Sequence, residues 1–373
     1  MSKIKIETLT PVHIGSGNLL HHNTDFVSVT IRNGDNTKPY LVVISEEKVW
    51  NLLSEQHLDN WLQAIAAREN LKEFLKRFAP DAKSKDYAKR RMSLFCEINP
   101  NDTLKECIHN GMGFPYIPGS SIKGAIRTAI LASIANRISG KERMIQVTNQ
   151  RGKVAVEATE IEKELFGEDP NSDVFRFIHA GDAYFEKETE IATRLIRLNI
   201  RQHKDSLWDT SKSQIIEAIG TEATSTFQLK VSKDYYDFVQ RNFPKAGKLP
   251  VSSISELFSM INGHTRKLVE EEMNYWNTVD KSDGEDYLDE MQKISQEINQ
   301  CEAGKSCVLR IGHASGWRFM TGAWTETLSN FKDVVIPASR PNNRAYEQYN
   351  FPKTRHIDED SFILGFVKLT IDD

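Results

Sequence analysis

The residue types and spacing with the clearest chemistry occur in one stretch, where a turn leads into a helix start that carries two cations. The turn contains Pro118 and Gly119, and Ser120 or Ser121 can cap the helix that follows. Free amides and the positive end of a helix dipole favour an anion at such a position. Lys123 and Arg127 are four residues apart, so they share one face of the helix. This stretch predicts a cradle for RNA phosphates.

Glycine residues extend the same prediction to three places in the chain. Gly119 and Gly124 carry no side chain, so a polynucleotide or a neighbouring strand can approach the backbone there. A strand-like segment at 4–9 leads into a second glycine turn at 10–17, and the segment 308–311 leads into a third at 312–317. None of the three matches a nucleotide-phosphate motif. They indicate a surface that admits an RNA backbone, with ordinary structural loops as the alternative.

The order of these motifs resembles the RAMP superfamily of CRISPR effector subunits, and within it the fifth subunit of the Csm (type III-A) complexes. Related subunits of Cmr-type complexes are the alternative within the superfamily. The segment 176–182 is a further, weaker match. The motifs that carry the resemblance are Thr-Pro-Val-His-Ile-Gly-Ser-Gly at 10–17, Tyr-Ile-Pro-Gly-Ser-Ser-Ile-Lys-Gly-Ala-Ile-Arg-Thr-Ala at 116–129, Arg-Ile-Gly-His-Ala-Ser-Gly at 310–316, Phe-Pro-Lys-Thr-Arg at 351–355 and Leu-Gly-Phe-Val at 364–367.

The resemblance implies a non-catalytic subunit that binds the guide RNA (crRNA) and caps the 3′-end side of a type III-A ribonucleoprotein. It also implies a role in crRNA maturation or stabilisation and in antiviral defence. The implied partners are crRNA, a neighbouring backbone RAMP subunit and the small subunit, with target RNA and host nucleases as further candidates. The RNA-binding residues carried over by motif position or by their place in the glycine loops are His13, Gly15, Ser16, Gly17, Pro118, Gly119, Ser120, Ser121, Lys123, Gly124, Arg127, Gly312, His313, Gly316, Lys353 and Arg355.

Two other functions are weighed against this one. Backbone RAMP subunits cut target RNA with an acidic residue on a loop, and Asp25 is the candidate for such a metal-dependent ribonuclease here. The segment after it is strand-like, so Asp25 can instead mark the start of a strand. The third hypothesis is a protein scaffold whose acidic region, 270–302, recruits host nucleases.

The net charge of −4 is the main compositional objection to RNA binding, because free-standing nucleic-acid-binding proteins are usually basic as a whole. Acidic residues concentrate between 270 and 302, whereas cations concentrate between 123 and 153. This separation of signs predicts one face toward RNA and another toward solvent or a partner. A solvated acidic helix is the alternative.

The remaining composition is that of an ordinary globular chain of 373 residues, with 39% hydrophobic residues and a mean hydropathy of −0.48. No apolar run approaches the length of a membrane span, and the N-terminus reads as a strand, so we expect a cytoplasmic protein that does not associate with a membrane. The four cysteines form neither a C-x-x-C pair nor a secretory framework. We expect no metal, no cofactor and no catalytic nucleophile.

Hydrophobic periodicity predicts an α+β fold. Strands are expected at 4–9, 26–32, 40–44, 175–178, 194–200, 220–231, 307–311 and 362–369, and a helix from the Pro-Gly turn to about 138. The resemblance implies that the core is ferredoxin-like (RRM-like). We expect that core to comprise 1–45, 112–232 and 307–373, interrupted by a helical insertion at 46–111 and a second, acidic helical insertion at 233–306.

Overall fold

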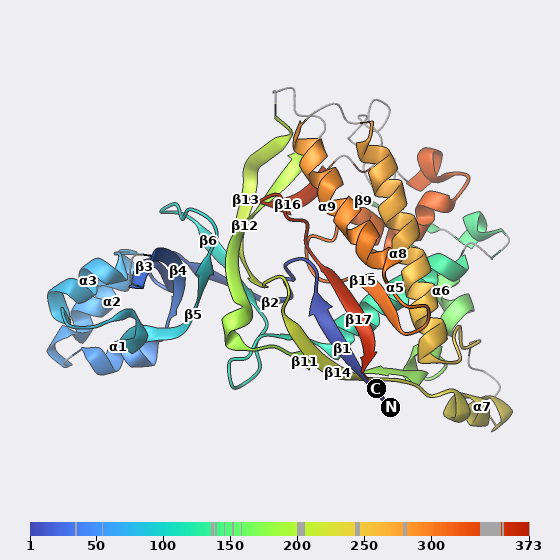
Figure 1. Ribbon diagram of the computed structural model, residues 1–373, viewed down its shortest axis with the longest axis horizontal. Coiled ribbons are helices and arrows are strands. Elements are labelled where there is room, and N and C mark those ends of the chain that lie inside the picture. Colours follow the sequence, from blue (N-terminus) through green and yellow to red (C-terminus); the bar gives the residue numbers. More distant parts are fainter. Residues whose placement is uncertain are drawn as a thin grey trace.

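The computed structural model confirms a mixed fold of helices and curled sheets (Figure 1). It describes residues 1–373 except 34–35, 54, 136–137, 139, 145, 151–152, 158, 200–205, 243–246, 279–281, 336–351, 353 and 373. The two termini lie side by side, because the first strand pairs with the last. Among the described residues, no helix is long and apolar enough to cross a membrane.

One sheet has five antiparallel strands in the order β10-β14-β1-β17-β15. Ile4 and Ile6 of β1 alternate with polar residues and are fully buried, which is the pattern of a strand with one covered face. The strands of this sheet are β1 Ser2–Thr8, β10 Ile178–Ala180, β14 Thr224–Val231, β15 Ser306–Arg310 and β17 Phe366–Asp372.

Helices α5 (Gly119–Ala135) and α8 (Ile254–Trp276) pack with this sheet into the largest hydrophobic core. Ile122, Ile126 and Ile130 recur every four residues along α5, so they form one buried face. That face shares its core with Ile4 and Ile6 of β1. The other helices of this half of the molecule are α6 Thr159–Phe166, α7 Lys233–Asn242 and α9 Ser282–Asn299.

A second, eight-stranded sheet runs away from this core in the order β2-β6-β13-β12-β5-β4-β3, with β16 paired to β12. The two long strands at its centre, β12 and β13, pair antiparallel with each other, and each also forms a short parallel pairing, with β5 and β6 respectively. The strands are β2 Gly15–His21, β3 Phe26–Asn33, β4 Asn36–Ile44, β5 Ala88–Leu94, β6 Thr103–Cys107, β12 Glu190–Asn199, β13 Trp208–Ile219 and β16 Thr354–Asp358.

Short helices cover the outer part of this sheet and form a lobe at one end of the molecule (Figure 1). Phe26 and Val27 are adjacent on β3, point to opposite faces and are both buried, so this strand is covered on both sides. Val27 packs with Trp61 and Phe74 of the helices. The helices are α1 Glu46–Leu52, α2 Leu58–Ala66, α3 Leu71–Phe78 and α4 Ser84–Tyr87.

Smaller elements complete the chain. Two two-stranded sheets are formed by β7 Tyr116–Ile117 with β11 Ala183–Tyr184 and by β8 Gln146–Gln150 with β9 Lys153–Glu157. The short helical turns are η1 Glu55–His57, η2 Lys141–Met144, η3 Val174–Phe177, η4 Lys187–Thr189, η5 Trp317–Phe319, η6 Thr321–Thr327 and the π-turn η7 Phe331–Val335.

Several expected elements agree with the structure, and two do not. The interval 46–111 is helical only in its first part, because residues 88–94 and 103–107 are β5 and β6 of the large sheet. Met92 and Leu94 are buried and alternate with more exposed neighbours, a period of two that indicates a strand. Residues 174–177 form a helical turn capped by the Asp173 side chain, so the strand expected at 175–178 begins only at Ile178. The division into a core and two insertions stays a prediction.

Candidate nucleic-acid interface

The first and third glycine turns lie against each other in the structure. The backbone amide of His313 donates to the carbonyl oxygen of His13 over 2.9 Å. Gly312 has a φ of +85°, and a Cβ atom there would lie 2.6 Å from the same oxygen. Gly365 donates to the carbonyl oxygen of Pro11, and its own φ is +93°. These glycines therefore let three distant segments of this chain pack together.

The two histidines of these turns have different surroundings. His13 is buried, its Nδ1 atom lies 2.6 Å from the carbonyl oxygen of Glu217, and burial lowers its pKa to about 4. The ring of His313 is exposed and meets the ring of His13 edge-on, 5.6 Å between centroids. Of the pair, His313 is the residue available to a ligand from solvent. Gly316, with a φ of +81°, lies just beyond it.

Gly15, Ser16 and Gly17 are the first three residues of strand β2, and all three are exposed. The Ser16 hydroxyl donates to Glu106 Oε2 over 3.1 Å, and the side-chain amide of Asn18 donates to the same oxygen over 2.8 Å. Glu106 thereby orients the exposed end of the first glycine turn.

The turn at Pro118 and Gly119 is held by the chain itself. The Gly119 amide donates to Asp182 Oδ1 over 2.8 Å, so a carboxylate of this protein occupies part of the anion position at the start of α5. A Cβ atom on Gly119 would lie 2.1 Å from the carbonyl oxygen of Ala180, whereas one on Gly124 would meet nothing within 4 Å. Gly119 is therefore a close-packing position and Gly124 faces open space. Ser120 is exposed and Ser121 partly so.

The two cations of α5, Arg127 and Lys123, differ in their contacts with the rest of the protein. Arg127 forms ion pairs with Asp173 at 2.9 Å and Glu162 at 3.2 Å, and its guanidinium lies 4.3 Å from the centre of the Phe166 ring. Lys123 makes no ion pair within the described part of the chain, and partial burial lowers its pKa. The charge of Arg127 is largely neutralised, which leaves Lys123 as the cation of this helix that can meet a phosphate.

The C-terminal motif is divided between a buried residue and one outside the described ranges. Arg355 is 4% exposed, and its Nη2 and Nε atoms lie 2.8 and 2.5 Å from the two oxygens of Glu272. Burial raises the pKa of Glu272, but Arg355 and then Arg318 lower it to about 2. Arg355 therefore holds β16 to α8. Lys353 lies outside the described residues.

A cationic cavity of about 840 Å³ opens beside the first glycine turn, and Ser16 lines it. Five cations line the same cavity. Arg90 is paired with Glu106 and Glu217, and the other four form no ion pair within the described ranges. They are Lys85, Lys89, Arg91 and Lys187. Among the residues that line the cavity, Ser16 alone was a sequence candidate. The run Lys89-Arg90-Arg91 is a cluster of cations from which this site could have been predicted.

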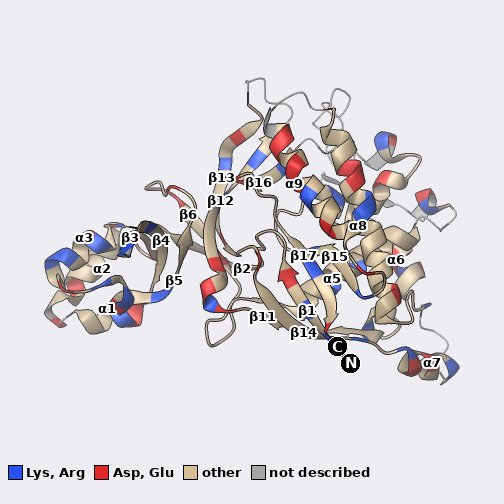
Figure 2. Ribbon diagram, viewed as in Figure 1, with Lys and Arg blue, Asp and Glu red and all other residues tan. Residues whose placement is uncertain are grey.

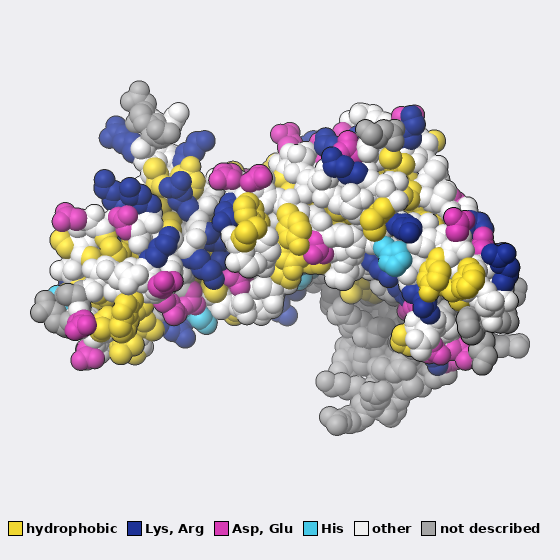
Figure 3. All heavy atoms as spheres, turned by 90° about the horizontal axis from the view of Figure 1, so that it is seen from below, with side chains coloured by type: hydrophobic (Ala, Val, Ile, Leu, Met, Phe, Trp, Pro, Cys, Tyr) yellow, Lys and Arg dark blue, Asp and Glu magenta, His cyan; other side chains and the backbone are white. Residues whose placement is uncertain are grey.

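Aromatic rings accompany two of these cations. Lys187 Nζ lies 4.7 Å from the centre of the Phe114 ring, and the Arg91 guanidinium lies 5.1 Å from that of Tyr40. Figure 3 shows Lys and Arg side chains gathered at the end of the molecule that carries β3, β4 and β5. Unpaired cations beside exposed backbone form an arrangement that can bind phosphates.

Comparisons with known proteins give the family and the fold of the chain. The model of the RAMP superfamily matches residues 5–296. The chain belongs to the RAMP superfamily. It is 23% identical over 398 residues to a "CRISPR system Cms protein Csm5" of Methanocaldococcus jannaschii, covering 99% of this chain and 88% of the relative. It is 30% identical over 142 residues to a protein of the same description from Streptococcus thermophilus, covering 35% of this chain and 37% of that one.

Two solved structures share the fold of this RAMP protein. One is a chain of a Csm-crRNA-target RNA ternary complex of a type III-A CRISPR-Cas system, with a TM-score of 0.70, 16% identity and complete coverage of both chains. The other is Csm5 of T. onnurineus, with a TM-score of 0.63 and 16% identity over 97% of this chain and 99% of that one. The sequence resemblance to Csm5-like RAMP subunits of type III-A systems is thereby confirmed.

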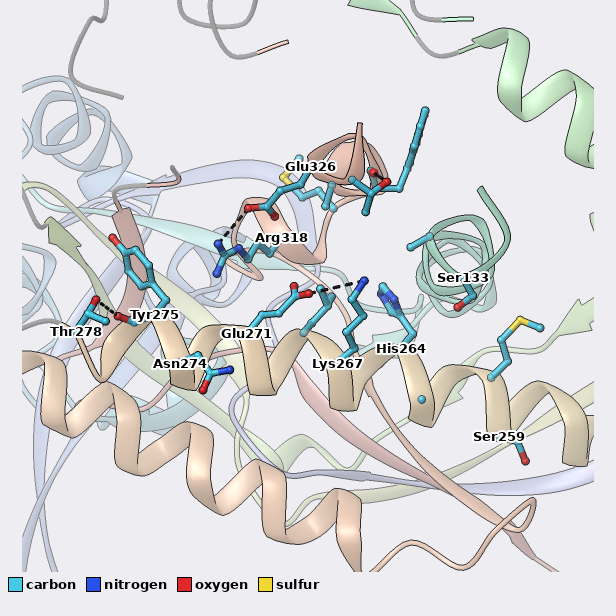
Figure 4. A pocket seen from close by; sticks show the side chains of 18 residues that line it. Ser133, Ser259, His264, Lys267, Glu271, Asn274, Tyr275, Thr278, Arg318 and Glu326 are labelled. Carbon is cyan, nitrogen blue, oxygen red and sulfur yellow. Dashed lines mark hydrogen bonds and ion pairs between the residues drawn. The ribbon is translucent and has the colours of Figure 1, made fainter. Parts of the chain in front are cut away.

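A second cavity of this RAMP protein, about 810 Å³, lies between α5, α8 and η6 (Figure 4). Its charged side chains are paired: Lys267 with Glu271 at 3.7 Å, and Arg318 with Glu326 at 3.1 Å. Because its charges are balanced, this cavity is less suited to a polyanion than the first.

The structure also bears on the two alternative functions, the metal-dependent ribonuclease and the acidic scaffold. The carboxylate of Asp25 accepts the His21 amide over 2.7 Å and closes the turn between β2 and β3. In the acidic region, Glu272 is buried, and Figure 2 shows basic as well as acidic residues on α8 and α9. Glu290 lies 2.6 Å from Lys293. The expected separation of charges into an acidic and a basic face is therefore incomplete in the described part of α8 and α9.

Proposed function

We propose that the chain is a non-catalytic crRNA-binding subunit of a type III-A Csm complex. Family membership and the Csm5 relatives support a place in such a complex. The observation that carries RNA binding is the cavity lined by Lys85, Lys89, Arg91 and Lys187, whose charges have no carboxylate partner in the described ranges. Such charges attract a polyanion and release its counterions.

The proposed RNA path connects this cavity with the exposed glycine turns. Ser16 lines the cavity and belongs to the first turn, which lies beside His313 of the third through His13. The positive charge of Lys105 on β6 is close enough to His313 and His356 to help lower the pKa of both. It adds a cation beside the two glycine turns. The RNA backbone would cross exposed main chain at Gly15 and Gly17 and meet cations on β5.

We also infer a ferredoxin-like core, which would fit the same proposal. In the five-stranded sheet, β17, β1, β14 and β10 lie in the order that a βαββαβ chain adopts when its last strand pairs with its first. Helices α5 and α8 fall in the two crossover positions, after β1 and after β14. Strand β15 is then an addition at the edge. The core would present its exposed loops, rather than a covered sheet face, to the RNA.

We further propose that the chain caps the 3′-end side of the crRNA and occurs once per complex. A repeating subunit needs two complementary faces, and the helices at 46–87 and 233–299 add bulk that can occlude one of them. Native mass spectrometry of the assembled particle tests this. One copy per particle is expected, and several copies in contiguous contact would exclude capping.

Sequencing of the RNA that co-purifies with the tagged chain tests crRNA binding. Repeat-derived crRNA fragments are expected together with backbone and small subunits. Recovery of neither the fragments nor the partners would overturn the proposal. The ribonuclease alternative is tested by incubating crRNA-complementary RNA with the chain and Mn²⁺. If the chain cleaves this RNA and the Asp25→Ala variant does not, the chain is a ribonuclease and the non-catalytic proposal is wrong.

A further inference from the structure

Three ionisable side chains lie close together beside the cationic cavity, and two of them line it. His109 Nε2 lies 2.6 Å from Glu190 Oε1, and ligand atoms of His109, Glu190 and Glu217 all lie within 4.8 Å of one another. They come from three separate places: the segment after β6, the first residue of β12 and the last part of β13. His109 and Glu190 line the cavity, so a small solute can reach them.

Backbone and side-chain contacts hold this cluster in place. Glu217 is fully buried, and its Oε2 accepts the Cys107 amide over 2.7 Å. Its Oε1 lies 2.5 Å from Arg90, which also contacts Glu106 at 3.0 Å. Two of the three residues are on the central antiparallel pair of the large sheet, so their positions are set by rigid elements.

One oxygen of the cluster has no partner among the residues that the structure describes. Glu190 is only 2% exposed, and its Oε1 is hydrogen-bonded to His109, but its buried Oε2 meets no hydrogen-bond donor of the described chain. A buried carboxylate oxygen that lacks a donor costs free energy, so native structures rarely leave one unsatisfied. This oxygen belongs to the same side chain that already meets His109 and lines the cavity.

The net charge of the cluster indicates which kind of ligand it suits. When ionised, Glu106, Glu190 and Glu217 carry three negative charges, and Arg90 between them carries one positive charge. With His109 neutral, as a metal ligand must be, the net charge is −2. The lysines on the cavity wall, Lys85, Lys89 and Lys187, are not ion-paired with this cluster in the described ranges.

We propose that His109, Glu190 and Glu217 bind one divalent cation, Mn²⁺ or Zn²⁺. One imidazole nitrogen and two carboxylates form a mixed donor set that suits these metals rather than Ca²⁺. A divalent charge balances the two uncompensated negative charges, and coordination satisfies Glu190 Oε2. The site goes beyond RNA binding and does not depend on it. From the sequence we expect no metal, and the three proposed ligands are scattered over the chain.

Mn²⁺ provides the direct test, since it does not favour the free cysteines. Tag-free protein is stripped with a chelator, titrated with Mn²⁺ and followed by electron paramagnetic resonance of the free ion, with thermal unfolding in parallel. We expect one equivalent bound and a rise in Tm, both lost in Glu190→Gln and in His109→Gln. Zn²⁺ added in competition should release the bound Mn²⁺.

Glu188→Gln is the matched control, because Glu188 lines the same cavity but is exposed and outside the cluster. It should bind Mn²⁺ as the unmodified chain does. The proposal is overturned if the unmodified chain binds no Mn²⁺ or Zn²⁺, or if a folded Glu190→Gln or His109→Gln variant binds them unchanged. Circular dichroism checks the fold of each variant, and the titration of the unmodified chain decides the question even if both variants misfold.

Discussion

The backbone amide of His313 is hydrogen-bonded to the carbonyl oxygen of His13, although the two residues lie near opposite ends of the chain. Gly365 donates to Pro11 in the same region, and Val12 bridges to Ile219. Three motifs that are separate in sequence thus pack against one another. A substitution in either turn should disturb both.

The first prediction concerns the cations of the cavity. Lys89→Ala combined with Arg91→Ala should weaken binding of crRNA-repeat RNA, because both are exposed and lack a carboxylate partner in the described ranges. Each lost phosphate contact lowers the slope of log affinity against log salt by about one unit at most. Lys76→Ala with Lys163→Ala is the control, since both lysines are paired with neighbouring glutamates. Equal affinity and slope in all three proteins would place the RNA elsewhere.

The second prediction separates the two cations of α5. Arg127→Ala should lower stability by about 1–3 kcal/mol, because two partly exposed ion pairs and stacking on Phe166 are lost, with little change in the salt slope. Lys123→Ala should leave stability nearly unchanged and lower RNA affinity. Urea unfolding and RNA titrations measure the two effects. If Arg127→Ala instead lowered RNA affinity and Lys123→Ala lowered stability, Arg127 would be the phosphate ligand.

The third prediction uses two glycines of one helix as a matched pair. Gly119→Ala should destabilise the protein by about 1–3 kcal/mol or more, because the new methyl group would meet the Ala180 carbonyl oxygen. Gly124→Ala should stabilise it by about 0.5–1 kcal/mol, since the site is open and alanine favours a helix. Thermal unfolding compares them. Opposite signs are the expected outcome, and a stable Gly119→Ala would contradict the packing.

The fourth prediction concerns the buried pair of Arg355 and Glu272. Arg355→Ala should cost about 3–5 kcal/mol, because it leaves much of the Glu272 charge uncompensated inside the protein. The folded pKa of Glu272, about 2, is below its ordinary value of 4.5, so this stabilisation is complete above pH 4.5 and is lost as pH falls toward 2. Urea unfolding at several pH values measures it.

Lys76→Ala is the control for this pair, since its ion pair with Glu73 is exposed and its loss should leave stability nearly unchanged. Glu272→Gln should flatten the pH dependence between 4.5 and 2. An unchanged profile would mean that other carboxylates dominate acid unfolding.

The fifth prediction follows from one buried and two half-buried histidines. Burial lowers the pKa of His13, His264 and His356 from 6.5 to about 4, so the unfolded chain binds protons that the folded chain does not. Stability is therefore full above pH 6.5 and falls as pH decreases from 6.5 to 4. His264→Gln should reduce the proton uptake on unfolding by about one in this range. If its slope matched that of the unmodified chain, His264 would not be neutral in the folded state.

The local sequence pattern was sufficient to predict an element where one of its faces is buried. Ile4 and Ile6 alternate on β1, and Ile122, Ile126 and Ile130 recur at helical spacing on α5, so both elements could be predicted. Strand β5 was missed because its alternation is short and follows a helical run. The turn at Val174–Phe177 was mistaken for a strand because a brief apolar run does not distinguish the two.

The sequence by itself determined the family, the α+β class and the glycine turns, because these depend on residue types at fixed local spacing. Only the tertiary structure decided which candidate side chains face solvent. His13, Arg127 and Arg355 resemble ligands in sequence, yet burial or carboxylate partners from distant segments engage them. Lys89, Arg91 and the cluster of His109 with Glu190 emerge only when strands far apart in the chain are paired. Charge compensation is a property of distances in space, and sequence spacing does not encode those distances.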